Sequence, residues 1–184
     1  MKIVVISYSL SGNNEALANS IAEEFAVEHI KITEPKPRTM GSIILDQIFN
    51  RAPQVQPIPD RLEKYDLILF FGPVWMGHVA TPLRAYLKHL KTNLRRYAFI
   101  SISGGADGAN PKLAGELKRR VGIEPVALID LHIADLLPAN PKPVRKDTSA
   151  YRINNGDIKK LTDTIVKTMR ETIRNWEHSC NNHK

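Results

Sequence analysis

The stretch Ile3-Val4-Val5-Ile6-Ser7-Tyr8-Ser9-Leu10-Ser11-Gly12-Asn13-Asn14 leads directly into an amphipathic pattern that runs from Glu15 to Glu28. The apolar run predicts a buried strand, and the polar residues around Gly12 predict a tight loop before a helix. The first backbone N–H groups of a helix lack partners within it, and the helix dipole adds partial positive charge there. Residues 9–14 are therefore a candidate anion site, and an ordinary Ser/Asn helix cap is the alternative.

The side chains of this loop limit the class of anion that it could bind. It contains no Lys or Arg, so hydroxyl, amide and backbone donors would hold the ligand. Neutral donors suit a cofactor monophosphate better than a triphosphate with its metal. The chain has no Gly-x-x-x-x-Gly-Lys-Ser/Thr motif, and the first loop has no Gly-x-Gly-x-x-Gly motif. A P-loop nucleotidase and a dinucleotide-type Rossmann site are therefore disfavoured.

Five apolar runs alternate with helical patterns along the chain, and they predict strands at 2–8, 28–33, 66–72, 97–103 and 125–131. Continuously apolar strands such as Leu67–Phe71 are typical of a parallel sheet covered on both faces. The sequence thus predicts an α/β fold with a doubly wound, five-stranded parallel sheet of order 2-1-3-4-5 and helices on both faces. Helices are expected at 13–28, 42–50, 82–92, 111–121 and 157–176.

Length and composition predict one domain over residues 1–184. Two proline-containing segments, 34–64 and 137–156, are long connections that could form a substrate wall or a dimer contact. Residues 177–184 are expected to form a disordered tail, and no metal site is predicted there or elsewhere. The single cysteine fits a reducing compartment, so we expect a cytoplasmic protein without a transmembrane segment.

The formal net charge is +7, and the excess lies in residues 61–122, which hold 11 basic and 4 acidic groups. The cations concentrate at Arg84, Lys88, Lys91, Arg95, Arg96, Lys112, Lys118, Arg119 and Arg120, and most of them fall late in two predicted helices. They are either solvated helix ends or a surface for an anionic partner. Aromatic residues that could stack on bases are sparse in this region, which argues against nucleic acid as the partner.

Ligands of an open α/β sheet bind beyond the carboxyl ends of the strands. Two further turn-rich loops are expected at that edge, Gly72–His78 and Ser101–Gly108. Trp75, between Gly72 and Gly77, could offer a flat apolar face to a planar ring.

These motifs together resemble the flavodoxin-like family of FMN-binding redox proteins, in its generic branch rather than among the small acidic electron carriers. The resemblance covers essentially the whole chain and rests on Tyr8–Asn13, on Gly72–Gly77 followed by Pro82–Leu87, and on Ser103–Gly105. It implies that FMN phosphate is held by Ser9, Leu10, Ser11, Gly12, Asn13 and Asn14. It further implies that the isoalloxazine ring is lined by Pro73, Val74, Trp75, Met76, Gly77, Ser103, Gly104 and Gly105.

The resemblance leaves three functions open. The protein could be an oxidoreductase that takes hydride from NAD(P)H and passes electrons to a quinone or a similar acceptor, with His78 as a proton donor. It could instead be an electron shuttle that serves a redox protein. A flavin-free module that binds an acidic partner through residues 84–120 is the third reading. A homodimer is compatible with each of them.

Overall fold

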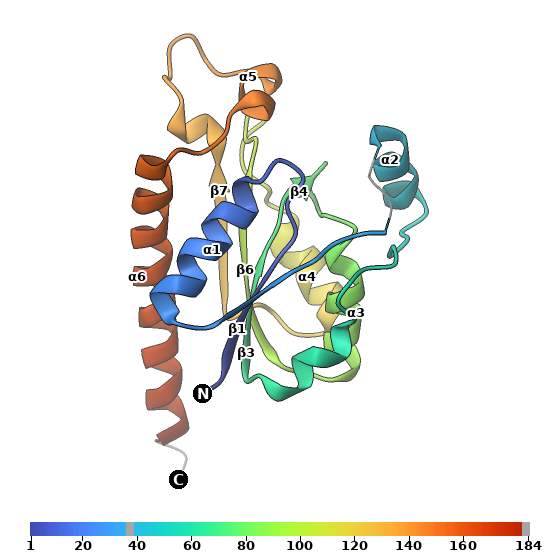
Figure 1. Cartoon of the computed structure of the whole chain (residues 1–184), viewed down its shortest axis with the longest axis vertical. Coiled ribbons are helices and arrows are strands. Elements are labelled where there is room, and N and C mark those ends of the chain that lie inside the picture. Colours follow the sequence, from blue (N-terminus) through green and yellow to red (C-terminus); the bar gives the residue numbers. More distant parts are fainter. Residues whose placement is uncertain (36–38, 182–184) are drawn as a thin grey trace.

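The computed structural model describes residues 1–35 and 39–181, and a five-stranded parallel sheet forms its centre (Figure 1). The strands are β1 (Ile3–Ser7), β2 (Glu28–Lys31), β3 (Leu67–Phe71), β6 (Arg96–Ser103) and β7 (Ala127–His132). Their order, β2-β1-β3-β6-β7, confirms the predicted 2-1-3-4-5 order of a flavodoxin-like sheet. Ser7 pairs with Phe71, and Phe71 pairs with Ile100, so the loops after β1, β3 and β6 leave the same edge of the sheet.

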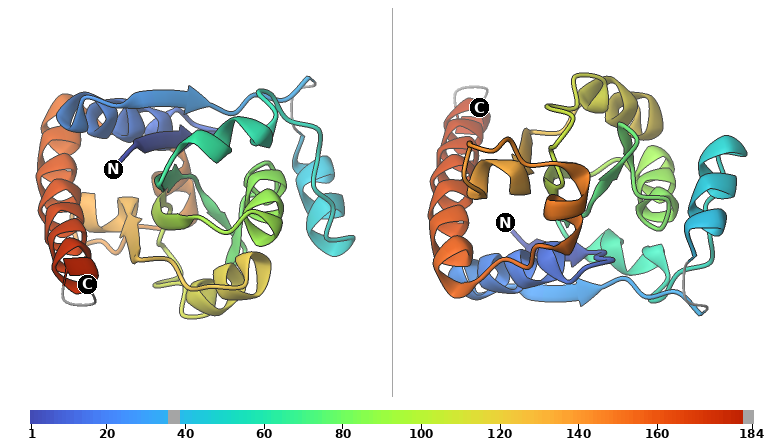
Figure 2. Two further views of the ribbon diagram at one scale, coloured as in Figure 1. Left: turned by 90° about the horizontal axis from the view of Figure 1, so that it is seen from below. Right: turned by 90° about the horizontal axis from the view of Figure 1, so that it is seen from above.

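Two helix pairs cover the two faces of this sheet (Figure 2). On one face lie α1 (Asn13–Phe25) and α6 (Asn155–Asn181), and on the other lie α3 (Leu83–Thr92) and α4 (Leu113–Val121). Side chains of a strand alternate between faces, so Val4 packs with the α3–α4 side and Val5 with the α1–α6 side. Both residues are fully buried, which explains why the strands read as continuous apolar runs.

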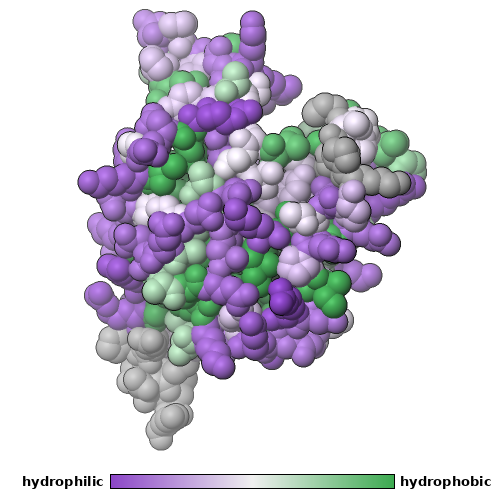
Figure 3. All heavy atoms as spheres, in the orientation of Figure 1, coloured by the Kyte–Doolittle hydropathy of each residue, from purple (hydrophilic) through white to green (hydrophobic). Residues whose placement is uncertain are grey.

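The segment between β2 and β3 carries a short helix, α2 (Met40–Ile48), and a 3-10 turn, η1 (Pro59–Lys64). Helix α2 stands at the side of the molecule, away from the sheet (Figures 1 and 2). Apolar spheres gather in this region of Figure 3, at the upper right. Ile48, at the end of α2, is 69% exposed, and Phe49, which follows it, is 60% exposed. This part of the surface is therefore unusually apolar for a region in contact with water.

Besides the 3-10 turn η1, four described elements were not expected from the sequence. A two-stranded hairpin, β4 (Val74–Trp75) and β5 (His78–Val79), replaces the loop after β3. A 3-10 turn, η2 (Ile133–Leu136), follows β7, and a short helix, α5 (Arg145–Ala150), lies within the connection 137–156. Helix α6 continues to Asn181 and so enters the segment 177–184 that was expected to form a disordered tail; residues 182–184 lie outside the described part of the chain.

Helix α6 is the longest helix that the structure describes, yet it carries charged and polar residues along its length. None of the helices in residues 1–35 and 39–181 is both long and apolar enough to span a lipid bilayer.

Candidate functional site

The loop between β1 and α1 presents a row of unused hydrogen-bond donors. Gly12 caps α1 with a φ of 90°, a left-handed conformation that glycine adopts without strain. The first backbone bond of the helix runs from the Ala16 N–H to the Gly12 carbonyl, at 2.9 Å. Within the described residues, none of the backbone N–H groups of residues 10–15 donates a hydrogen bond. The free N–H groups and the helix dipole together suit an anion, and we refer to residues 9–15 as the anion cradle.

Ser9 adds a side-chain donor to this cradle. Its Oγ is buried, and it has no hydrogen-bond partner among the described residues. A buried hydroxyl without a partner is costly in a folded protein, so the Ser9 hydroxyl fits a ligand that would accept a hydrogen bond from it. Leu10 is 54% exposed at the outer side of the loop. The sequence prediction that this loop can hold a phosphate group is therefore compatible with the geometry of the cradle.

Asn13 and Asn14 have a different role from the one expected of their side chains. The Asn14 amide donates to the Ile102 carbonyl at 2.9 Å and accepts from the Ile102 N–H at 3.0 Å. The Asn13 amide donates to the Tyr151 carbonyl at 3.1 Å and accepts from the Ile153 N–H at 3.2 Å. Both residues are 2% exposed. Their amides join α1 to β6 and to the chain before α6, so only their backbone N–H groups face the cradle.

His29 supports the base of this loop from β2. Its Nε2 lies 2.8 Å from Ser7 Oγ at the end of β1, and its Nδ1 lies 2.7 Å from Asn19 Oδ1 on α1. Burial lowers the pKa of His29, because the interior disfavours the charged imidazolium. The neutral ring therefore connects β1, β2 and α1 directly below the anion cradle.

A cavity of about 400 Å³ opens at the same edge of the sheet, between the β4–β5 hairpin, the loop after β6 and α5. It is lined by Val74, Met76, Gly77, Ser103, Gly104, Gly105, Ala106, Asp107, Gly108, Ala109, Asn110, Arg145 and Thr148. Six of the residues predicted to surround a planar ring thus lie together here. The volume is within the range of small-molecule sites, about 300–1,000 Å³.

The hairpin reaches the cavity through a strained turn. Met76 and Gly77 both have positive φ angles, 52° and 75°, which fits the tight type I′ connection of a two-residue hairpin. Methionine seldom adopts this conformation, and Met76 is also 65% exposed at the cavity wall. An apolar side chain held in a strained, exposed position is typical of a ligand-binding turn.

Close packing fixes the loop after β6. Gly105 has a φ of 72°, and a Cβ at this position would lie 2.3 Å from the Cβ of His132. Asp130 holds the same loop from β7, because its Oδ2 accepts from the Asn110 side chain at 2.9 Å and lies 3.2 Å from His132 Nε2. The loop therefore rests on two side chains of β7 without space for a larger residue at position 105.

Helix α5 closes the cavity from one side, and it lies within the connection 137–156 that the sequence suggested as a possible substrate wall. Arg145 Nε donates to Asp107 Oδ2 at 2.9 Å, and this ion pair connects α5 with the loop after β6. Thr148 is buried against Gly104, where a Cβ would lie 3.0 Å from its Oγ1. The only sequence signal for this wall was the long connection 137–156, which carries several basic residues.

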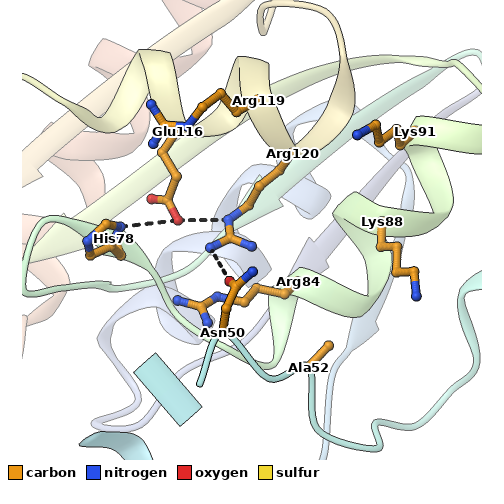
Figure 4. A pocket seen from close by; sticks show the side chains of 9 residues that line it. All are labelled: Asn50, Ala52, His78, Arg84, Lys88, Lys91, Glu116, Arg119 and Arg120. Carbon is orange, nitrogen blue, oxygen red and sulfur yellow. Dashed lines mark hydrogen bonds and ion pairs between the residues drawn. The ribbon is translucent and has the colours of Figure 1, made fainter. Parts of the chain in front are cut away.

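Three predicted residues lie elsewhere. Pro73 and Trp75 are not part of the cavity lining; the Trp75 ring instead meets Tyr8 edge to face, with centroids 5.9 Å apart. His78 faces away from the cavity, toward a second hollow, and its Nδ1 lies 3.4 Å from Glu116 Oε1 (Figure 4). The side chain of Trp75 is thus engaged with the core, and that of His78 with α4.

Comparison with known proteins agrees with this architecture. The sequence model of the family described as NADPH-dependent FMN reductase matches residues 1–114. A flavoprotein from Lactobacillus acidophilus NCFM, crystallised in complex with FMN, is 24% identical; the match covers 70% of this chain and 92% of that chain, with a TM-score of 0.57. A putative flavoprotein from Bacteroides eggerthii DSM 20697 is 15% identical over 90% of this chain and 98% of that chain, with a TM-score of 0.61. At these identities the solved structures show a shared fold.

Proposed function

The chain belongs to the NADPH-dependent FMN reductase family, and on this premise we propose that it is an FMN-dependent oxidoreductase, which takes hydride from NAD(P)H and reduces a quinone or a similar acceptor. FMN is the cofactor that both the family and the sequence motifs indicate. The observation that carries the proposal is the row of unpaired N–H groups at residues 10–15, at the same sheet edge as the cavity. A phosphorylated, planar cofactor would use both features at once.

The residues of the site fit FMN, although their roles differ from those first expected. The backbone N–H groups of residues 10–15 and the Ser9 hydroxyl would hold the phosphate. Val74, Met76 and Gly77 would cover one side of the ring, and Ser103, Gly104 and Gly105 would approach it from the other. When bound, FMN supplies two-electron chemistry with the nicotinamide and transfer of those electrons to the acceptor.

The protein's own contribution is to bind and orient the FMN and to shield it from water. The Met76 side chain and α5 would limit the access of water to the cavity, and the Arg145–Asp107 pair would hold α5 in place. We assign no proton transfer to His78, because it lines the other hollow. The aromatic face of Trp75 is likewise left out of the ring contacts.

Removal of the Ser9 hydroxyl tests the binding of FMN. We expect Ser9→Ala to raise the Kd for FMN roughly tenfold, because a hydrogen bond to a charged group is lost. Ser149→Ala on α5 is the matched control, since the Ser149 hydroxyl is exposed and bonds to the Lys146 carbonyl. Quenching of flavin fluorescence during titration gives both values. Equal affinity in the two variants would mean that the phosphate lies elsewhere.

The reaction is tested by NADPH oxidation in the presence of FMN, with and without a soluble quinone. Turnover with quinone supports the oxidoreductase. Tight FMN binding without turnover would favour the electron shuttle, and the absence of FMN binding would favour the flavin-free module. The same assay with NADH in place of NADPH determines the nucleotide preference.

Two further expectations belong to this proposal. A homodimer would cover the exposed apolar side chains of Ile48, at the end of α2, and of Phe49, which directly follows it. Light scattering of the purified protein measures its mass. A cytoplasmic location, expected from the single cysteine, would place the protein in a reducing compartment.

A further inference from the structure

A second and larger cavity, of about 740 Å³, lies on the α3–α4 side of the sheet (Figure 4). Its lining comes from three segments: the chain after α2, helix α3 and helix α4, with His78 of the hairpin at one end. The residues are Asn50, Ala52, His78, Arg84, Lys88, Lys91, Glu116, Arg119 and Arg120. None of these lining residues is a Phe, Tyr or Trp. The two cavities share the β4–β5 hairpin, since Gly77 lines one and His78 the other.

The lining combines five Lys and Arg side chains with a single carboxylate, that of Glu116. This carboxylate is already occupied. It is 3% exposed, accepts from the Val79 N–H at 2.9 Å and from Arg120 Nε at 2.7 Å, and lies 3.4 Å from His78. Glu116 therefore offsets the charge of Arg120 and, in the part of the chain that the structure describes, makes no ion pair or hydrogen bond with the lysines of the lining.

Three of those cations have no partner within the described residues. Lys88, Lys91 and Arg119 make neither an ion pair nor a side-chain hydrogen bond there, whereas Lys118 on the same helix as Arg119 pairs with Glu124 at 3.0 Å. Arg84 is 3% exposed and is fixed in place, because its Nη1 donates to the Asp46 carbonyl at 3.1 Å. Cations held together in a concavity repel one another, so an anion that enters it is attracted by all of them.

We propose that this cavity binds a small molecule that carries two or more phosphate groups. Its volume is that of a small-molecule site, about 300–1,000 Å³. One phosphate could meet only part of the charge, whereas linked phosphates reach cations on both α3 and α4. Arg and Lys are the side chains that bind phosphate through charge-assisted hydrogen bonds. The absence of aromatic rings from the described lining disfavours single-stranded nucleic acid, which is held partly by stacking.

The phosphates could come from two sources. If the proposed function holds, they could belong to NADPH, whose nicotinamide would reach the flavin cavity past the shared hairpin. Alternatively, a separate polyphosphorylated compound could bind and regulate access to the hairpin. The recognition chemistry is the same in both cases, so the binding site can be tested without flavin and without turnover.

The test is calorimetric titration of the full-length protein with inorganic tripolyphosphate at low ionic strength. We expect saturable binding that weakens as salt is added. In the double variant Lys88→Gln/Lys91→Gln we expect roughly threefold to thirtyfold weaker binding, from the loss of two charge contacts. The matched control is Lys159→Gln/Lys160→Gln on α6, which removes the same charge from exposed positions on the opposite face of the sheet. Circular dichroism melting verifies that all three proteins are folded.

The possible results separate clearly. Weaker tripolyphosphate binding in the α3 variant alone supports the site. If the KM for NADPH rises in that variant by a similar factor, the phosphates are those of the dinucleotide; an unchanged KM assigns the site to a separate ligand. The absence of tripolyphosphate binding at millimolar concentration overturns the proposal, as do equal affinities in the three proteins. Binding of an oligonucleotide without binding of tripolyphosphate also overturns it. None of these binding results depends on whether the protein reduces a quinone.

Discussion

Gly105→Ala is expected to lower the free energy of unfolding by about 2–5 kcal/mol and to weaken FMN binding. The backbone of Gly105 has a φ of 72°, and an L-residue there costs about 1–2 kcal/mol. The new Cβ would lie 2.3 Å from the Cβ of His132, and overpacking of this kind costs about 1–3 kcal/mol. The His132 side chain is only 12% exposed and is held by Asp130, so the loop itself must move.

Gly108→Ala provides the matched control, because Gly108 lines the same cavity with a φ of 93° and has nothing within 4 Å of a Cβ. Gly108→Ala should therefore lower the free energy of unfolding only by the backbone strain of an L-residue, about 1–2 kcal/mol. Urea unfolding measures the difference between the two variants, for which we expect about 1–3 kcal/mol. Fluorescence titration with FMN then shows whether the displaced loop weakens binding. Equal unfolding midpoints and equal FMN affinities would refute the idea that the contact with His132 sets the position of the loop.

Three further substitutions test individual features. Asn14→Ala leaves two Ile102 backbone groups unpaired, and each should lower the free energy of unfolding by about 1–3 kcal/mol. Urea unfolding of the variant and of wild type measures this loss, and a loss below about 0.5 kcal/mol would contradict the prediction. Because burial lowers the pKa of His29 below 6.5, its contribution to stability is complete above pH 6.5 and is lost as pH falls through the folded-state pKa. Urea unfolding between about pH 5 and 8 should show this dependence in wild type and less of it in His29→Gln; identical profiles would exclude His29 as its source. Met76→Gly should raise the free energy of unfolding by about 1 kcal/mol, because glycine adopts the φ of 52° without strain. The same variant should bind FMN more weakly in the fluorescence titration. A rise in both stability and FMN affinity would show that Met76 does not contact the ligand.

The fold could be predicted because each strand and helix carries its own local pattern. The continuous apolar run Leu67–Phe71 and the loop around Gly12 were sufficient to predict the sheet and the edge at which we propose the ligand site. The short elements were missed for a physical reason. The hairpin around Met76 contains two residues per strand, and α5 has no apolar periodicity over its six residues, so neither produces a readable repeat.

Side-chain partners across long sequence separations were the part that the sequence could not show. Asn14 looks like a helix-cap or phosphate residue until Ile102, 88 positions away, is seen to occupy its amide. From the sequence, the cations of α3 and α4 fit either separate solvated helix ends or a surface for an anionic partner. Only the packing of the two helices side by side brings Lys88 and Arg119 to one cavity.

The two asparagines at the start of α1 have a consequence for the cofactor-free protein. Since their amides are satisfied by the chain itself, the anion cradle keeps its shape before any ligand arrives. Binding then loses little conformational entropy, which is the advantage of a preorganised site. The apoprotein should accordingly be a stable, native species that can be stored and reloaded, and its rate of reconstitution should be set by diffusion and access past α5 rather than by refolding of the loop.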